Sequence, residues 1–268
     1  MHTNCRNCET TLVAEYEFCP GCGQKADLHR LGLHELVHDG IHYFTHADKG
    51  LFQLVRDLVA KRGIVAKEYI EGKRRKYFPP LNFFLIIAAI FVFTATFKQS
   101  QLPIDVYEKH PELRDETDPA TKTRLEKIYT RAEKANRFTN SYSNLIAMAA
   151  LPLSAFIYFL FYKKAKYNYI EHVVAGMYLL GFCLLIYALI LIPIAYLLGI
   201  SRLYMVAVLM FLQLFYGATF YVGFLGKSGA ANYFKAFGVS LVSLLVWIVG
   251  SSFTVRLYIT NGFWGILP

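Results

Sequence analysis

Long apolar runs constrain the fold of this chain more than any other feature. Each is close to the roughly 20 residues that a helix needs to cross a bilayer. They lie at Leu81–Phe97, Asn144–Tyr162, Val173–Leu198, Leu203–Leu225 and Ala236–Val255. The mean hydropathy of the 268 residues is +0.35, and 55% of them are apolar, which is unusual for a soluble protein. We therefore expect an all-α polytopic membrane protein with about five transmembrane helices.

The formal net charge of +9 is distributed in a way that predicts a topology. KRRK at Lys73–Lys76 precedes the first apolar run, and KKAK at Lys163–Lys166 follows the second. Lys and Arg are enriched in cytoplasmic loops, so these ends are expected in the cytoplasm. The N-terminus is then cytoplasmic and the C-terminus extracytoplasmic. This bias explains the positive charge without a nucleic-acid partner, and none is expected.

The loop at 98–143 between the first two runs mixes both charge signs almost evenly, and we expect it to be extracytoplasmic and partly helical. Asp118 suits a helix N-cap, with Pro119 at the first helical position. In the third run, Pro193 is expected to kink the span or to end it early.

Four cysteines near the N-terminus have the spacing of a metal site. CRNC (Cys5–Cys8) and CPGC (Cys19–Cys22) can each offer two thiolates to one tetrahedral zinc. The alternatives are two disulfides or a redox-active dithiol, but a cytoplasmic location keeps thiols reduced. The intervening TLVAEYEF alternates enough for a small β-hairpin. We expect a zinc ribbon at 1–26, with the zinc in a structural role because four thiolates leave no open coordination position.

The segment HELVHDGIHYFTH at 34–46 raises a second metal hypothesis. His34, His38, His42 and His46 fall on one face of a helix. A metalloprotease would use His34 and His38 as ligands and Glu35 as the base, but no third ligand is evident. Two other interpretations are a water-facing amphipathic stripe and an accessory metal or pH-sensitive site. We expect the stripe, without peptidase chemistry.

Residues 27–79 are predicted to form interfacial amphipathic helices. Gly50–Gly72 has apolar residues on one face and charges mostly on the other, with a break at Gly63. The following KRRKYFPP combines basic and aromatic residues, which suits either contact with anionic lipid or a topological stop without lipid specificity.

The order of these motifs resembles a known family. CRNC, FCPGCGQ, a His-rich helix, GLFQLVRDL and YIEGKRRKYFPPLNFF, followed by several spans, look like a family of bacterial membrane proteins of unknown function with an N-terminal zinc ribbon. The resemblance covers about residues 4–97, and Glu171–His172 is a weaker, separate point of similarity. It implies the bacterial cytoplasmic (inner) membrane and an architecture, but no activity.

The predicted organisation is therefore a ribbon at 1–26, interfacial helices at 27–79 and a transmembrane helical domain at 80–268. Ionisable groups are almost absent from the spans, which disfavours a coupled transporter. We expect a binding, adaptor or regulatory role in which the ribbon contacts a protein partner and the rest contacts the lipid bilayer. The alternatives are a channel or transporter formed by the helical bundle, and a zinc-dependent membrane hydrolase using His34, Glu35 and His38.

Overall fold

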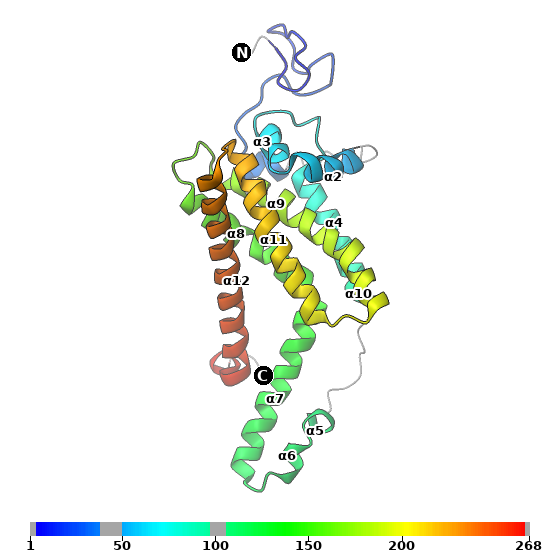
Figure 1. The fold of residues 1–268 in the computed structure, drawn as a ribbon, viewed down its shortest axis with the longest axis vertical. Helices are drawn as coiled ribbons and strands as arrows, with labels where there is room; N and C mark the ends of the chain where they lie inside the picture. Colours follow the sequence, from blue (N-terminus) through cyan, green and yellow to red (C-terminus); the bar gives the residue numbers. More distant parts are fainter. Residues whose placement is uncertain (1–3, 38–49, 97–105, 266–268) are drawn as a thin grey trace. The chain divides into compact units, whose positions relative to one another are not determined.

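The computed structural model describes residues 4–37, 50–96 and 106–265, and in these residues the chain is mostly helical (Figure 1). It divides into two compact units. The first unit combines Met1–Phe91 with Leu151–Leu244, and the second combines Val92–Ala150 with Leu245–Pro268. The long helices α4 (Pro80–Thr96), α8 (Ser143–Phe161) and α12 (Ala230–Gly265) each contribute to both units.

Within the described residues, every predicted apolar run falls on helix except for Tyr162, which lies in the turn after α8. Three helical segments are long and apolar enough to cross a membrane, namely Tyr169–Leu198, Tyr204–Leu225 and Ala230–Gly262. Shorter apolar helices occur at Pro80–Ile90 in α4 and Met148–Phe161 in α8. The prediction of a helical membrane protein is therefore supported for three spans. Crossings by α4 and α8 stay predictions.

The span at Tyr169–Leu198 is not one regular helix. It consists of α9 (Tyr169–Ile186), a π-helical turn η1 (Tyr187–Leu191) and α10 (Ile192–Leu198). Pro193 has no backbone N–H, and its ring clashes with the carbonyl one turn earlier in a regular α-helix. The wider π-turn immediately before Pro193 accommodates this defect, so the span is interrupted there and not ended.

In the first unit, α2 (Gly50–Lys61) and α3 (Ile64–Ile70) pack on two of the candidate membrane-spanning helices. Helix α3 contacts both α9 and α11 (Arg202–Leu225), and α2 contacts α9. Their buried residues include Leu54 and Leu58 of α2 and Tyr69 of α3. The Tyr69 ring meets that of Tyr178 in α9 edge-on at 5.9 Å. The apolar face expected along the membrane thus buries much of its surface against the bundle itself.

Small residues allow the helices of this unit to approach closely. A Cβ atom on Gly63 would lie 1.8 Å from the carbonyl oxygen of Phe220, so the turn between α2 and α3 sits directly on α11. A Cβ on Gly181 of α9 would lie 2.6 Å from the Phe83 ring of α4. Close contact through small residues is typical of helix packing in membranes.

The second unit contains the predicted helix in the loop. Helix α7 (Pro119–Ser141) begins with Asp118 as its N-cap, whose side chain accepts hydrogen bonds from the backbone N–H groups of Ala120 and Thr121. This confirms the prediction for Asp118 and Pro119. Two short helices, α5 (Val106–Lys109) and α6 (Glu112–Asp115), pack on α7.

Residues 4–37 contain no β-strand, so the predicted β-hairpin of the ribbon is not seen. Isolated bridges join Asn4 to Thr11 and Phe18 to Lys25. Each bridge closes one cysteine loop on itself, and the residues between the loops are mainly turn and bend. The backbone hydrogen bonds that a hairpin would need are formed within the two loops instead.

Candidate metal centre and its junction with the helices

The two cysteine loops repeat the same backbone geometry fourteen residues apart. In the first, Cys5 N donates to Thr10 O and Glu9 N donates to Cys5 O. In the second, Cys19 N donates to Gln24 O and Gly23 N donates to Cys19 O. The residue after the second cysteine of each loop is left-handed, with φ of 63° at Glu9 and 69° at Gly23. Both loops therefore close through the same left-handed turn.

The four thiols converge on one point. The Sγ atoms of Cys5 and Cys22 are 3.7 Å apart, and those of Cys8 and Cys19 are 3.5 Å apart. All four sulfurs lie within 4.8 Å of one another, and none is in a disulfide. Four sulfurs held about 2.3 Å from a tetrahedral metal are about 3.8 Å apart. The predicted cysteines therefore form a cluster whose size suits a metal ion.

Thr10 favours the ionised form of one ligand. Its hydroxyl oxygen lies 3.1 Å from Cys8 Sγ. Hydrogen bonds from the side chain and backbone of Thr10 lower the pKa of the Cys8 thiol to about 6. Metal binding requires thiolates, so this contact supports the role of Cys8 as a ligand.

Residues 4–26 hold the four cysteines, and we keep the name ribbon for them although they contain no β-strand. This segment is attached to the loop that joins α3 to α4. The side-chain oxygen of Gln24 accepts hydrogen bonds from the backbone N–H groups of Arg74 and Arg75, at 3.1 and 3.4 Å. Asn7, inside the first cysteine loop, accepts one from Lys76 N at 3.1 Å. Gln24 is 3% exposed, so these bonds are well shielded from water. The two cysteine loops together thus bind three consecutive backbone N–H groups, those of Arg74, Arg75 and Lys76.

The basic cluster at Lys73–Lys76 is used within the protein. The carboxylate of Glu68 in α3 accepts three hydrogen bonds. The donors are Lys73 Nζ at 3.0 Å, Lys76 Nζ at 2.6 Å and the Tyr77 hydroxyl at 2.5 Å. Burial alone would raise the pKa of the Glu68 carboxyl. Hydrogen bonds from these three donors outweigh burial and lower that pKa to about 2. The two lysines therefore position the loop and are less available to lipid than the sequence suggests.

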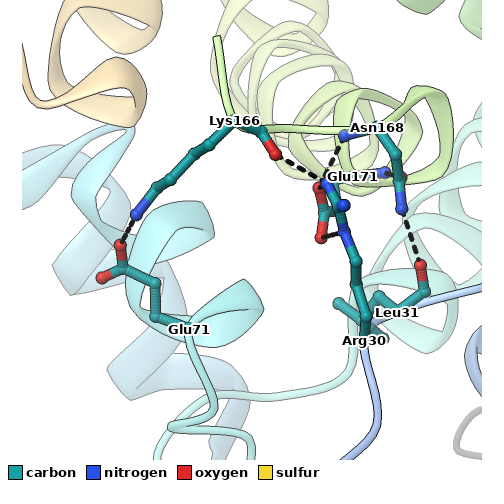
Figure 2. Close-up of polar contacts among 6 residues, drawn as sticks. All are labelled: Arg30, Leu31, Glu71, Lys166, Asn168 and Glu171. Carbon is teal, nitrogen blue, oxygen red and sulfur yellow. Dashed lines mark hydrogen bonds and ion pairs between the residues drawn. The ribbon is translucent and has the colours of Figure 1, made fainter.

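A second set of polar contacts ties the N-terminal segment to the start of α9 (Figure 2). Arg30 donates to both carboxylate oxygens of Glu171, with Nε–Oε1 at 3.0 Å and Nη2–Oε2 at 2.9 Å. The Asn168 side chain donates to Leu31 O at 3.2 Å. Asn168 and Glu171 also form a capping box at the N-terminus of α9. The same residues that begin the helix therefore hold the chain that leaves the ribbon.

Lys166 makes a further link in the same region. Its Nζ lies 2.6 Å from Glu71 Oε1, which connects the end of α3 to the loop before α9 (Figure 2). Its backbone oxygen accepts a hydrogen bond from Arg30 Nη2 at 2.6 Å. Ribbon linker, α3 and α9 thus meet at one junction.

Beside this junction lies a buried histidine. His172 is 0% exposed, and neither of its ring nitrogens has a hydrogen-bond partner among the described residues. Its ring stacks on Tyr221 at 6.0 Å and meets Phe224 edge-on at 5.7 Å. The Tyr221 hydroxyl is also buried without a described partner. Unsatisfied polar groups are costly inside a bundle, so this pair requires an explanation.

The histidine stripe is only partly described. A helix covers 33–37, and in it Glu35 accepts a hydrogen bond from Gly32 N at 3.1 Å. Bonds from its own backbone N–H and from that of Gly32 outweigh desolvation and lower the pKa of the Glu35 carboxyl. A lowered pKa makes a weaker general base, and the contact shows Glu35 acting at the helix start. His38, His42 and His46 lie outside the described residues.

Sequence reasoning missed the residues that attach the ribbon. Gln24 and Asn7 carry no motif, because their partners are backbone groups of a distant loop. Glu68 carries none either, although its partners lie only five to nine residues further along the chain. Asn168 and Glu171 did carry a signal, since Asn-x-x-Glu before an apolar run is a capping-box pattern. That pattern predicts the start of α9 but not its partner Arg30.

Comparison with known proteins found a family match for only one part of the chain. Residues 48–92 match the model of a family described as a protein of unknown function (DUF3667). Within the described residues, the match covers α2, α3, the loop with Lys73–Lys76 and most of α4. No curated protein and no solved structure matched the chain. The matched segment includes Glu68 and the backbone to which the ribbon is attached.

Proposed function

We propose that this protein is a binding or adaptor protein of the bacterial cytoplasmic membrane, in which a zinc-loaded ribbon is held in a fixed pose and presented to a protein partner. One observation carries the proposal. Asn7 and Gln24, which belong to the two cysteine loops, bind consecutive backbone amides of the loop at Lys73–Lys76. A ribbon serving only as a folded terminus would not need this attachment.

Zinc is the metal that best suits the cluster. Four thiolates in a tetrahedral arrangement are typical of structural zinc, which has no redox chemistry and needs no open position. The residues that would hold it are Cys5, Cys8, Cys19 and Cys22. Bound zinc would supply folding free energy to a module that has few buried apolar residues of its own. The metal has a structural role in this proposal, and the ribbon acts by contact.

The contact surface we favour is the apolar part of the segment between the cysteine loops. Val13, Tyr16 and Phe18 are 55%, 44% and 57% exposed. Glu15 and Glu17 alternate with them and are also exposed. Exposed apolar residues that lie together often mark protein interaction sites. Their acidic neighbours favour a partner that combines apolar and basic side chains.

The experiment measures zinc and attachment in the full chain, purified in nanodiscs. We expect one zinc per chain in the parent and none in a Cys19→Ser/Cys22→Ser variant. A Gln24→Ala/Asn7→Ala variant should keep zinc but be cut faster by trypsin after Lys25 and Arg30, because the detached backbone there can enter the protease. Two zincs per chain would revive the histidine site and the hydrolase alternative. Zinc retained by the cysteine variant would contradict the metal assignment.

The proposed topology follows from the basic loops. Lys73–Lys76 and Lys163–Lys166 belong in the cytoplasm, with 98–143 and the C-terminus outside. In intact cells, a cysteine placed at Thr121 should react with a membrane-impermeant maleimide and one placed at Ser228 should not. The reverse pattern would invert the topology.

A channel or transporter is the second candidate, and the buried pair of His172 and Tyr221 favours it. Polar groups inside a membrane bundle often mark a substrate or ion path. His172→Phe removes both unpartnered nitrogens at similar volume, so it should leave stability unchanged or raise it. If ion flux into proteoliposomes is present in the parent and lost in this stable variant, transport is supported. Flux absent from the parent excludes this candidate.

A further inference from the structure

Helix α7 carries four cations on one face. Arg124, Lys127, Arg131 and Lys134 recur at intervals of three or four residues, which places them within about 80° of the helix circumference over about 15 Å of length. We call this set the cationic face of α7. The acidic residue Glu133 lies on another side and pairs with Lys109 of α5, with Nζ–Oε2 at 2.6 Å.

The cationic face lines a surface groove. A groove of about 310 Å³ is bordered by Thr123, Arg124, Lys127 and Arg131 of α7 and by Thr260 of α12. The open surface beside this groove is lined by α7 alone; it shares three of these residues and extends to Thr130 and Lys134. Cations and hydroxyl donors therefore surround the same space. The only acid among the described lining residues is Glu126, on the open surface beside the groove.

These four cations make no ion pair with any described residue. Other cations among the described residues do pair with an acid: Lys73 and Lys76 pair with Glu68, and Arg30 pairs with Glu171. Like charges that are one turn apart repel one another and destabilise an isolated helix. Four of them on one face, beside a groove, form an arrangement that an anion would stabilise.

We propose that the groove between α7 and the end of α12 binds the phosphate group of an anionic ligand. Arg124 and Arg131 offer planar guanidinium groups that can each donate two hydrogen bonds to phosphate oxygens. Lys127 adds a point charge between them, and Thr123 and Thr260 offer hydroxyl donors. The second unit then has a function of its own, independent of the ribbon.

The test uses the full chain in phosphatidylcholine nanodiscs with inorganic pyrophosphate as the probe. Binding measured by calorimetry at low salt should be lost progressively as ionic strength rises. Arg124→Gln/Arg131→Gln should weaken it at least about tenfold, because the variant loses the charge-assisted hydrogen bonds of two guanidinium groups. A second arm adds phosphatidylglycerol vesicles, which present the same phosphate chemistry on a lipid.

The matched controls are two lysines of α7. Lys127→Gln should weaken pyrophosphate binding about threefold or more, and Lys122→Gln, which lies about 140° away around the helix, should change it less than twofold. Pyrophosphate binding that the cationic-face variants weaken supports a soluble phosphate ligand. If those variants weaken only the binding of the vesicles, a lipid headgroup is supported. No binding of either, or equal losses in Lys122→Gln and Lys127→Gln, would overturn the proposal.

Discussion

Arg30 and Glu171 form a bidentate ion pair, with Nε–Oε1 at 3.0 Å and Nη2–Oε2 at 2.9 Å, although 141 residues separate them. The Glu171 side chain is 5% exposed and that of Arg30 is 59% exposed. Glu171 also accepts a hydrogen bond from Asn168 N at 2.6 Å. One buried carboxylate thus both caps α9 and holds the segment that follows the ribbon.

Arg30→Met should destabilise this junction. It removes two charge-assisted bonds and leaves a buried carboxylate with fewer partners, which costs about 1–3 kcal/mol. Thermal unfolding of the full chain in nanodiscs measures the loss. Lys166→Met is the control, because its partner Glu71 is partly exposed and such surface pairs contribute about 0–1 kcal/mol. Equal losses in both variants would show that burial of Glu171 does not strengthen the pair.

The two cysteine loops allow a matched test of backbone strain. Glu9 and Gly23 occupy the same left-handed position, with φ of 63° and 69°. A residue with a Cβ atom is disfavoured there by about 1–2 kcal/mol. We expect Glu9→Gly to strengthen the ribbon and Gly23→Ala to weaken it. A Cβ on Gly23 would have only Arg75 Nη2 nearby, at 3.9 Å, so the effect is conformational and not steric.

Zinc release to a chelator measures both changes. Glu9→Gly should slow the release and Gly23→Ala should accelerate it, each relative to the parent. If both variants release zinc at the parental rate, the left-handed turns do not limit the stability of the metal centre.

Gly63 should tolerate no side chain. Its Cβ would lie 1.8 Å from Phe220 O and 2.6 Å from Phe224 N, both backbone atoms of α11 that cannot move independently. Gly63→Ala is therefore expected to lose about 1–3 kcal/mol or more, as overpacking does. Gly238→Ala is the control, because nothing lies within 4 Å of its added Cβ in α12. Alanine in a helix should be neutral there or stabilise by up to about 1 kcal/mol.

Melting temperatures of the two alanine variants in the same detergent decide the matter. A Gly63→Ala protein as stable as Gly238→Ala would mean that α2 and α3 are not seated on α11 in solution.

Features set by local sequence were predictable. The spacing of Cys5, Cys8, Cys19 and Cys22 predicted the cluster of thiols. Asp118 with Pro119 predicted the start of α7, because a cap uses only the residues that follow it. The interruption near Pro193 followed from its missing N–H. In each case the chemistry lies within a few residues of the motif.

Features set by distant contacts were not predictable. The basic residues at Lys73–Lys76 suggested lipid contact or a topological stop, but the nearby Glu68 and the ribbon engage them. Gln24 and Asn7 bind this loop across 50 and 69 residues, and no pattern in one sequence shows such a pairing. Gly63 marked a break in a helix, and its contact with Phe220 arises only when α11 packs against it. The hairpin prediction was wrong because it rested on the alternating pattern of TLVAEYEF alone. The backbone groups at both ends of this segment instead form hydrogen bonds within the two cysteine loops.

The Glu68 cluster predicts how the junction responds to acid. The pKa of its carboxyl is lowered to about 2, below its usual value near 4.5, by hydrogen bonds from Lys76, Tyr77 and Lys73. A carboxyl whose pKa is lower in the folded state contributes stability that is fully present above the unfolded pKa. That contribution is lost as pH falls from about 4.5 through about 2.

Glu68→Gln should therefore be less stable than the parent at pH 7, and the difference should shrink between pH 4.5 and pH 2 as the parent carboxyl takes up its proton. Acid also releases metal bound by thiolates, but this affects parent and variant equally and cancels in their difference. Thermal unfolding of both proteins at pH 7, 4.5 and 3 measures it. Glu112→Gln is the control, because its carboxyl lies at an exposed site and meets His110 at 3.1 Å. A Glu68→Gln deficit that stays constant from pH 7 to pH 3 would show that the carboxylate charge does not hold the loop, and that packing around Tyr77 does.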